Sequence, residues 1–416
     1  MSAFDSVDVV AELRDLACIR SRCLKLYNLA IDGQLKHFRV QPEKLDDVVR
    51  YILAMIEEEY PTLDIPFHSR WRHFEAGGVA RHLQLQDEWM DCDALERARR
   101  HIDLVVVSVL IDAGAGPSWN YLETNSSRSF TRSEGLGVAS FWMFANGLFS
   151  SHDSIKHRVD AEALIHLTLE DLEKGFQVSA NNPLVGLSGR LELLKNLGFA
   201  LQNRSDFFGQ GEDLRPGHLV DFLLSSARSK NTVELKELWK IVLEGLQSIW
   251  PSAGRTHWNG INLGDVWHHS ALGTPDHPMS LIPFHKLSQW LTYSLLEPLA
   301  SSGIGVKGCD ALTGLPEYRN GGLLIDFEVL VPKDLKMLSQ RHLVGSEWVV
   351  EWRALTIVVL DLLAAHLQRA LSKSPEEFPL AKVLEAGTWK AGRKVAAQKR
   401  TGGHPPVEVM SDGTVF

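Results

Sequence analysis

The segment Ile282–Leu296 reads IPFHKLSQWLTYSLL and predicts a helix with two unlike faces, which Pro298 is expected to end. On a helical wheel of about 100° per residue, the apolar side chains gather on one side: Phe284, Leu287, Leu291 and Leu295. The opposite side carries Lys286, Gln289 and Tyr293. Because these are an ammonium, an amide and a phenol rather than the usual Glu and Lys of a wet surface, we expect this face to line a pocket. A solvent-exposed polar face is the alternative.

A second stretch, LPEYRNGG, brings a carboxylate, a phenol and a guanidinium together as Glu317, Tyr318 and Arg319. Glu317 follows Lys286 by 31 residues, which is enough chain to fold back and bring the two charges together. The two glycines permit positive φ and a close approach of the backbone to a ligand. We expect a ligand-binding turn that precedes a strand. An exposed turn with a local ion pair is the alternative.

Helical periodicity dominates the rest of the chain, and strand signals are sparse. The clearest alternation of apolar and polar residues covers 322–331. The sequence therefore predicts a mainly α fold, or α+β with a small β element near 322–331. We expect an N-terminal helical extension over residues 1–78, one large helical body over 79–400 and a tail over 401–416. The tail is expected to be disordered, although Val407–Met410 is apolar enough to dock on the body.

The composition argues against several classes of protein. The 416 residues are 44% hydrophobic, carry a formal net charge of −9 and include four cysteines without a C-x-x-C pair. Nonspecific binding of nucleic acid depends on a positive surface, which this charge disfavours. No apolar run reaches the roughly 20 residues of a membrane span, and no basic and apolar leader is visible. We expect a cytoplasmic protein that has no nucleic-acid or membrane partner and needs no cofactor; its oligomeric state is not predicted.

The segment 254–283 is long, lacks a helical period and is rich in Gly, Pro, His, Trp and Asn. Such segments in compact domains tend to be functional loops. We expect substrate contacts from Trp258, Asp265 and His268 in this region and from His285 just after it. Its density of His and Asp also supports a rival prediction, a metal site for hydrolysis built from Asp265, His268, His269, Asp276, His277 and His285. The region contains no H-E-x-x-H or H-x-H pattern, so the predicted site holds no metal.

Five phrases follow one another along the chain: EGLGVASFWMFANG at 134–147, LTLEDLE at 167–173, NPLVGLSGRLELLKNLG at 182–198, FHKLSQ at 284–289 and LTGLPEYR at 312–319. In this order they resemble the queuosine-salvage N-glycosidases, which release a base from a ribonucleoside 5′-phosphate. The resemblance covers about residues 100–330 and implies a related helical body that cleaves an N-ribosyl bond. Those relatives have Asp where this chain has Glu317, so the two carboxylates need not act alike.

Three further phrases are DAGAGPSWNY from Asp112, RPGHLVD from Arg215 and EYRNGG from Glu317. They resemble the uracil-catabolism family long labelled domain of unknown function 1688, over essentially the whole chain. That family is associated with a pathway that opens the uracil ring while it is attached to ribose and leaves a ribosylurea-type intermediate. Together the two resemblances imply an N-ribosyl hydrolase that cleaves ribosylurea, free or as the 5′-phosphate, to urea and ribose or ribose phosphate.

This implication assigns roles to particular side chains. Glu317 is expected to stabilise the sugar cation, and Lys286 to favour its ionised form. The candidate donors to the leaving urea are Tyr318, Arg319 and His268. Arg215 is the first candidate for a 5′-phosphate. Other expected substrate contacts are Asp112 and Glu123 at the ribose hydroxyls, Trp119 and Trp142 as walls, and Asn120, Gln289, Tyr293 and Asn320 in the same pocket.

Two other functions stay open at this point. One is a metal-dependent amide or urea hydrolase that uses the His and Asp residues of 265–285, which elemental analysis of the purified protein would identify. The other is a non-catalytic protein of the same pathway that binds a nucleoside or a related ligand. Binding of candidate substrates without any turnover would favour this second function.

Overall fold

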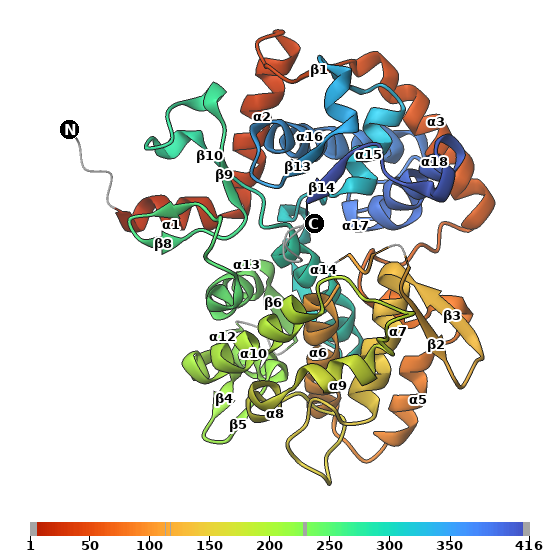
Figure 1. Cartoon of the computed structure of the whole chain (residues 1–416), viewed down its shortest axis with the longest axis vertical. Helices are drawn as coiled ribbons and strands as arrows, with labels where there is room; N and C mark the ends of the chain where they lie inside the picture. The colour runs from red at the N-terminus through yellow and green to blue at the C-terminus, as the bar shows by residue number, and fades with distance from the viewer. Residues whose placement is uncertain (1–5, 113, 117, 228–230, 411–416) are drawn as a thin grey trace.

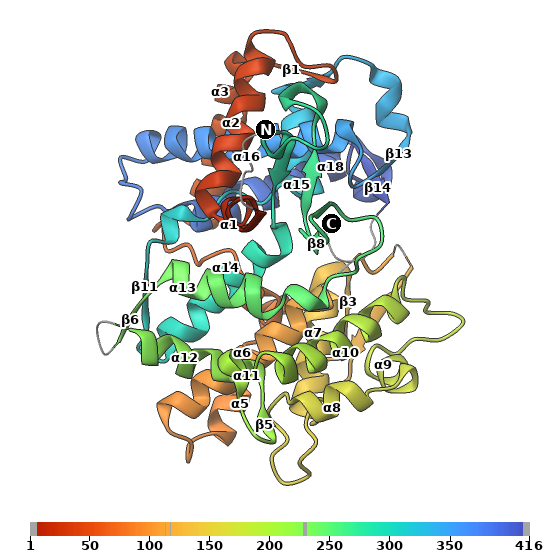
Figure 2. The same cartoon turned by 90° about the vertical axis from the view of Figure 1, so that its left-hand side faces the viewer.

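The computed structural model describes residues 6–112, 114–116, 118–227 and 231–410, and of residues 6–8 only the backbone. The described chain is mainly helical with short strands, which confirms the predicted fold class. Its helices form an upper and a lower half, and helix α14 (Lys286–Ser301) runs through the middle between them (Figures 1 and 2). No described helix is long and apolar enough to cross a membrane.

The upper half combines both ends of the chain. Helix α16 packs against α2, and α15 packs against α18, so segments far apart in sequence share one core. The division into an extension, a body and a tail stays a prediction. The helices of this half are α1 (Ser6–Arg14), α2 (Leu16–Ile31), α3 (Leu45–Glu59), α15 (Tyr318–Asp326), α16 (Glu347–Ala370), α17 (Leu380–Val383) and α18 (Trp389–Lys399).

The lower half is built around α6 (Ala94–Leu110), whose second half is buried on every side and packs against α14 and α7. The remaining helices of this half are α4 (Trp71–Phe74), α5 (Arg81–Glu88), α7 (Arg132–Ala145), α8 (Ala161–His166), α9 (Leu169–Gly175), α10 (Leu187–Asn203), α11 (Ser205–Phe208), α12 (Leu219–Ser226) and α13 (Leu235–Lys240).

The described strands pair only in twos. The antiparallel pairs are β1 (Phe38–Val40) with β12 (Leu330–Pro332), β2 (Asn120–Glu123) with β3 (Arg128–Thr131), β4 (Gly209–Gln210) with β5 (Asp213–Leu214), β7 (His257–Trp258) with β8 (Ile261–Asn262), and β9 (Val266–His268) with β10 (Leu281–Pro283). The parallel pairs are β6 (Thr232–Glu234) with β11 (Gly305–Lys307), and β13 (Arg341–Leu343) with β14 (Glu408–Met410).

The predicted β element near 322–331 is wrong over most of its length. Residues 318–326 form helix α15, and only Leu330–Pro332 is a strand. The reason lies in the two glycines, which adopt helical rather than positive φ. A Cβ on Gly321 would lie 2.7 Å from Trp352, and one on Gly322 would lie 2.8 Å from Pro406. The glycines therefore let α15 pack closely against its neighbours.

The predicted end of the central helix and the predicted disorder of the tail also differ from the structure. Helix α14 continues past Pro298 to Ser301 because Leu299 is fully buried in the last turn, and the Ser301 and Ser302 hydroxyls donate to the Pro298 carbonyl. The described part of the tail is ordered by hydrogen bonds, since strand β14 docks on β13. This confirms the docking expected for Val407–Met410; residues 411–416 lie outside the described chain.

A buried ion pair holds α16 to the segment before α14. The Arg353 guanidinium donates to both oxygens of Asp265 over 2.7 Å, and the Arg353 side chain is 1% exposed. The Asp265 carboxylate also accepts the backbone N–H of Lys286 over 2.9 Å. Removal of one member of a buried pair leaves an uncompensated charge, which is far more costly than loss of a surface pair.

We expect Arg353→Met to lower the free energy of unfolding by about 3–5 kcal/mol, because Asp265 would stay buried without its cation. Urea denaturation measures this change. The matched control is Arg50→Met, which removes an exposed pair with Asp47 and should cost less than about 1 kcal/mol. Equal losses in the two variants would contradict the assignment.

Candidate active site

The residues of the predicted centre line one small cavity of about 70 Å³ between the two halves. That volume holds several water molecules or a small polar group. Five of the predicted residues line it: Asp112, Lys286, Glu317, Tyr318 and Arg319. The rest of its lining consists of His68, His73, Gly114, Ser133, Trp290, Leu315 and Trp389.

Lys286 opens helix α14 and reaches into this cavity. The residue before it, His285, adopts a φ of 46°, in the left-handed region that non-glycine residues rarely occupy. Burial lowers the pKa of Lys286, and the carboxylates of Glu317 and Asp112 oppose this shift by attracting the ammonium. Lys286 and Glu317 therefore line one cavity and interact electrostatically, while their direct pairing stays a prediction.

Glu317 is the N-cap of helix α15. Its two carboxylate oxygens accept the backbone N–H groups of Arg319 over 2.8 Å and Asn320 over 2.6 Å. These two bonds fix the orientation of a side chain that is 7% exposed. The helix end thus holds a carboxylate in one position at the wall of the cavity.

Asp112 provides a second carboxylate and forms an ion pair with Arg70 over 2.7 Å. The Arg70 side chain is fully buried and also donates to the Ser133 carbonyl. Burial raises the pKa of Asp112, while Arg70 and Lys286 oppose the rise. Two carboxylates and an ammonium therefore share the cavity, and each carboxylate is positioned by different partners. Residues 113 and 117 of the predicted glycine-rich turn lie outside the described chain.

The aromatic wall of the cavity was not predicted. His68 Nδ1 and the Glu385 carboxylate form a hydrogen bond over 2.8 Å. The centre of the His68 ring lies 4.8 Å from that of Trp290 and 5.5 Å from that of Trp389. Glu385 lies in a π-helical turn, Leu384–Thr388, between α17 and α18. The sequence signal for this wall is the run FHSRWRHF at residues 67–74, which is rich in His, Arg and Trp.

His73 is the second histidine of the wall. Burial and the neighbouring charges of Arg70, His68 and Arg319 bring the pKa of His73 well below its ordinary value. Its imidazole is therefore neutral at neutral pH and adds no charge beside Lys286. It is able to act as a hydrogen-bonding partner for a neutral group in the cavity.

Three predicted contact residues support the site from behind. The Gln289 side chain donates to Thr313 Oγ1 and accepts the Thr313 N–H, both over 2.8 Å. The Tyr293 hydroxyl donates to the Thr313 carbonyl over 3.0 Å, and Asn320 Nδ2 donates to the Leu315 carbonyl over 2.9 Å. These bonds tie the segment before Glu317 to helix α14. None of the three residues lines the cavity.

Five other predicted contacts are engaged elsewhere. Arg215 forms buried ion pairs with Asp103 over 2.7 Å and Glu96 over 2.9 Å, so its guanidinium holds α6 and does not line the cavity. The others are likewise bonded outside it: Glu123 to Arg81, Trp142 to Glu123, Trp119 to the Phe176 carbonyl and Asn120 to Asn182.

The side chains of the loop before α14 point to separate partners. His268 bonds to the Gly273 carbonyl, His269 to Glu351 and His285 to the Leu13 carbonyl. Asp265 is held by Arg353, and Trp258 lies in β7. Across the described parts of the chain, no three His, Cys, Asp or Glu side chains come together as a metal-binding group. The loop therefore offers no assembled donor set for the rival metal chemistry.

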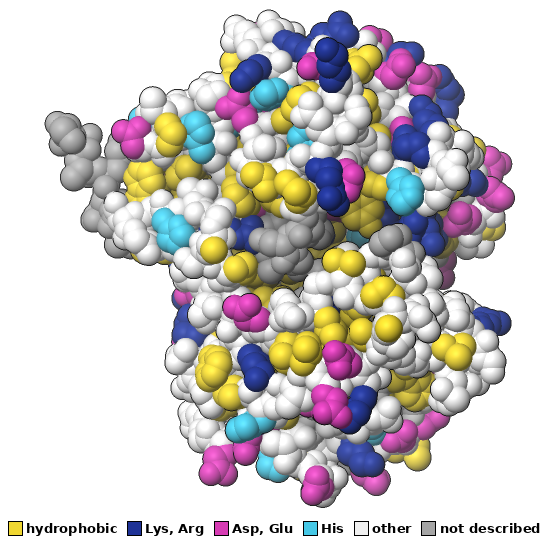
Figure 3. Space-filling model, viewed as in Figure 1, with side chains coloured by type: hydrophobic (Ala, Val, Ile, Leu, Met, Phe, Trp, Pro, Cys, Tyr) yellow, Lys and Arg dark blue, Asp and Glu magenta, His cyan; other side chains and the backbone are white. Residues whose placement is uncertain are grey.

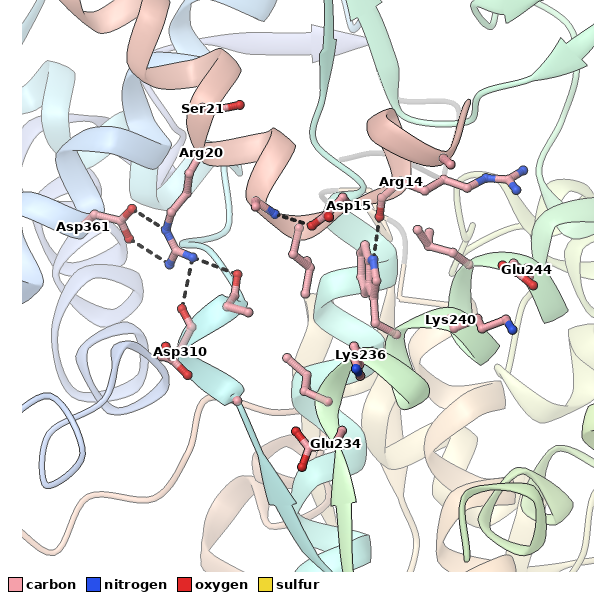
Figure 4. A pocket seen from close by; sticks show the side chains of 18 of the residues that line it. Arg14, Asp15, Arg20, Ser21, Glu234, Lys236, Lys240, Glu244, Asp310 and Asp361 are labelled. Carbon is pink, nitrogen blue, oxygen red and sulfur yellow. Dashed lines mark hydrogen bonds and ion pairs between the residues drawn. The ribbon is translucent and has the colours of Figure 1, made fainter. Parts of the chain in front are cut away.

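A much larger hollow lies elsewhere in the described chain. It measures about 1260 Å³ and is bounded by α1 and α2 above and by α13 and β6 below (Figure 4). Arg20 is bound to Asp361 at its edge, and Trp239 donates to the Arg14 carbonyl. It contains none of the predicted site residues. Charged side chains line both spaces, but those of the small cavity include the buried Glu317 and Arg319, which are 7% and 5% exposed. The small cavity is therefore the candidate site.

Comparison with known proteins adds a family and two relatives. A family described as "Protein of unknown function (DUF1688)" matches residues 12–416. The chain is 42% identical to "Uracil catabolism protein 4" of Lachancea kluyveri, over 92% of this chain and 93% of that protein. It is 41% identical to "Protein urg3" of Schizosaccharomyces pombe, over 99% and 100%.

The Asp112 shift predicts a pH effect on stability. In the folded protein the pKa of Asp112 lies above its ordinary value of 3.8. The contribution of Asp112 to the free energy of unfolding is therefore greatest below pH 3.8 and is lost as the pH rises through the folded pKa. Lys286→Met removes one charge that limits the rise. We expect this variant to be destabilised more at pH 7 than at pH 4, by about 1 kcal/mol or more, in urea denaturation. Lys390→Met, which removes a surface pair with Glu59, is the control. A loss independent of pH would refute the coupling.

Proposed function

We propose a function for this chain on the premise that it belongs to the DUF1688 family, as its match over residues 12–416 and its two relatives establish. The protein acts in uracil catabolism as an N-ribosyl hydrolase. Its substrate is ribosylurea, free or as the 5′-phosphate, and its products are urea and ribose or ribose phosphate. The name of one relative, "Uracil catabolism protein 4", supports the pathway. The chemistry is argued from the cavity.

One observation carries the proposal: the buried Glu317 carboxylate is fixed by two backbone N–H groups and lines one cavity with Lys286. Cleavage of an N-ribosyl bond develops positive charge at C1′, and a positioned carboxylate stabilises that charge. Because Glu317 is only 7% exposed, this interaction is stronger than it would be in water. Two carboxylates in the lining, Glu317 and Asp112, suit a developing cation.

The reaction breaks the C1′–N bond and forms a C1′–O bond to water. Glu317 faces the developing cation, and Asp112, held by Arg70, is suited to accept a hydrogen bond from a ribose hydroxyl. The Lys286 ammonium attracts both carboxylates and so offsets their mutual repulsion. Water gives one proton to the site as its oxygen bonds to C1′, and the departing nitrogen of urea takes up one proton.

The His68–Glu385 pair is the best candidate for delivering that proton. Urea is a poor leaving group as an anion, so protonation of its nitrogen accelerates departure. His68 lines the cavity and bonds to Glu385 through Nδ1. In the imidazolium form, Nδ1–H is donated to the Glu385 carboxylate and Nε2–H is the proton that is transferred to the urea nitrogen. The aromatic rings of Trp290 and Trp389 enclose the pair.

Product analysis tests the reaction directly. Metal-free protein is incubated with ribosylurea and, separately, with its 5′-phosphate, and urea and the sugar product are measured. Release of both in equal amounts supports N-ribosyl hydrolysis. Activity that appears only after zinc or manganese is added would favour metal-dependent hydrolysis, and binding without any release would favour a non-catalytic protein.

Glu317→Gln should lower turnover of the better substrate by about a hundred- to a thousandfold, because a neutral amide stabilises the sugar cation poorly. Stability should fall by only about 1 kcal/mol, since the amide oxygen still accepts one backbone N–H. The control is Asp93→Asn, which makes the same change at the exposed N-cap of α6. Full activity of Glu317→Gln would remove the residue from the mechanism.

His68→Gln should slow release of urea by about a hundredfold or more, because general acid catalysis typically contributes that much. A nitrophenyl riboside needs little protonation of its leaving group, so this variant should hydrolyse it at nearly the wild-type rate. Glu317→Gln should fail on both compounds. Equal losses of His68→Gln on both compounds would argue against proton delivery by His68.

A further inference from the structure

A second, larger hollow of about 780 Å³ adjoins the catalytic cavity, and we call it the outer hollow. It lies between the first residues of α7 in the lower half and α15, α18 and β14 in the upper half. The two spaces share Gly114, Ser133, Tyr318 and Arg319 in their linings. Arg319 and Tyr318 therefore stand at the boundary between them.

Arg319 is buried without hydrogen bonds for the outer part of its guanidinium. The residue is 5% exposed, and among the described residues neither Nη1 nor Nη2 has a partner in good hydrogen-bond geometry. Burial lowers the pKa of Arg319, but the nearby Tyr318 hydroxyl and the Glu317 and Glu134 carboxylates outweigh this and raise it. The Arg319 guanidinium lies 4.1 Å from the Trp389 ring centre and 5.5 Å from that of Tyr318. Buried donors of a charged group are costly when unsatisfied, so this arrangement indicates a ligand that supplies the acceptors.

The charge around the outer hollow points to an anion. Four arginines line it, Arg132, Arg319, Arg341 and Arg393. Arg341 is paired with Glu408 and Arg393 with Glu134 in the first turn of α7, so the local excess of positive charge comes from Arg132 and Arg319. This balance opposes the formal net charge of −9 of the whole chain. Figure 3 draws the face on which β14 lies, and Asp and Glu are interspersed with Lys and Arg over it. A local excess of arginine inside a hollow of an acidic protein concentrates anionic ligands.

The beginning of α7 adds donors at the same place. This 14-residue helix has no side-chain bond at its N-cap, Thr131, and its first residues, Arg132 and Ser133, line the outer hollow. Unsatisfied backbone N–H groups at a helix start attract anions. Together with the unpartnered guanidinium of Arg319, they give the outer hollow the donors that bind a phosphate group.

We propose that the outer hollow binds the phosphate of a 5′-phosphorylated ribosyl substrate, with Arg319 as its inner anchor. This inference rests on the proposed function and names the phosphorylated form as the substrate. The ribosyl carbon that reacts lies in the small cavity, and the phosphomonoester extends past Arg319. Arg215, the residue predicted from sequence for the phosphate, is held by Asp103 and Glu96.

Calorimetric binding of ribose 5-phosphate, ribose and inorganic phosphate tests the proposal at one fixed ionic strength. The wild type should bind ribose 5-phosphate at least about tenfold more tightly than ribose. Arg319→Met should lose this preference. Arg319→Lys, which keeps the charge but not the planar fork, should retain part of it. Circular dichroism and thermal melting establish whether both variants are folded. If Arg319→Met does not fold, the binding preference of Arg319→Lys decides the test.

The control is Arg50→Met, which removes an exposed arginine of α3 and should bind like the wild type. Equal binding of ribose and ribose 5-phosphate by the wild type, or an undiminished preference in the folded Arg319 variants, would overturn the proposal. So would inorganic phosphate that binds as tightly as ribose 5-phosphate, because the hollow would then be a site for free phosphate.

The same binding assay separates this inference from the proposed reaction. Glu317→Gln should keep the preference for ribose 5-phosphate, since Glu317 does not line the outer hollow. A phosphate preference in a protein that releases no urea would leave the anion site intact and refute the hydrolase. Release of urea from ribosylurea and its 5′-phosphate with equal kcat/KM would leave the hydrolase intact and refute the anion site.

Discussion

The Asp265 carboxylate holds the start of the central helix, and the geometry of the cavity depends on it. It accepts two bonds from Arg353, one from the Lys286 backbone N–H and one from Trp267 Nε1. Burial opposes its charge, yet Arg353 and the other donors hold the pKa of Asp265 below its usual range. A carboxylate saturated in this way cannot act on a substrate, but it determines where Lys286 begins α14.

Helices α14 and α15 are then joined by one short segment. Gln289 and Tyr293 bind Thr313 from the middle of α14, while Asn320 binds the Leu315 carbonyl from α15. The cap residue Glu317 lies between these attachments. Gln289, Tyr293 and Asn320, which were expected to contact the substrate, instead position the Glu317 carboxylate that lines the cavity.

The sequence allowed the helical fold and the meeting of Lys286, Glu317 and Asp112 at one cavity to be predicted, whereas the chemical roles of these residues stay predictions. Periodicity sufficed for the first, and two charges on flanking segments of one buried helix sufficed for the second. The strand near 322–331 failed because Gly321 serves close packing on Trp352, which sequence alone does not separate from a turn. Arg215 failed because its partners, Asp103 and Glu96, lie more than a hundred residues away. His68 and Glu385 were missed for the same reason.

The π-helical turn Leu384–Thr388 places both Glu385 and the start of α18. A π turn holds one residue more than the α-helix would need over the same length. Loss of a single residue there would restore a regular helix, and the widened turn that carries Glu385 would disappear. Glu385 would then lose its position beside His68, although Trp389 and the rest of α18 could keep theirs. The length of this turn, and not only its composition, is therefore constrained, so that insertions and deletions are less tolerable here than substitutions.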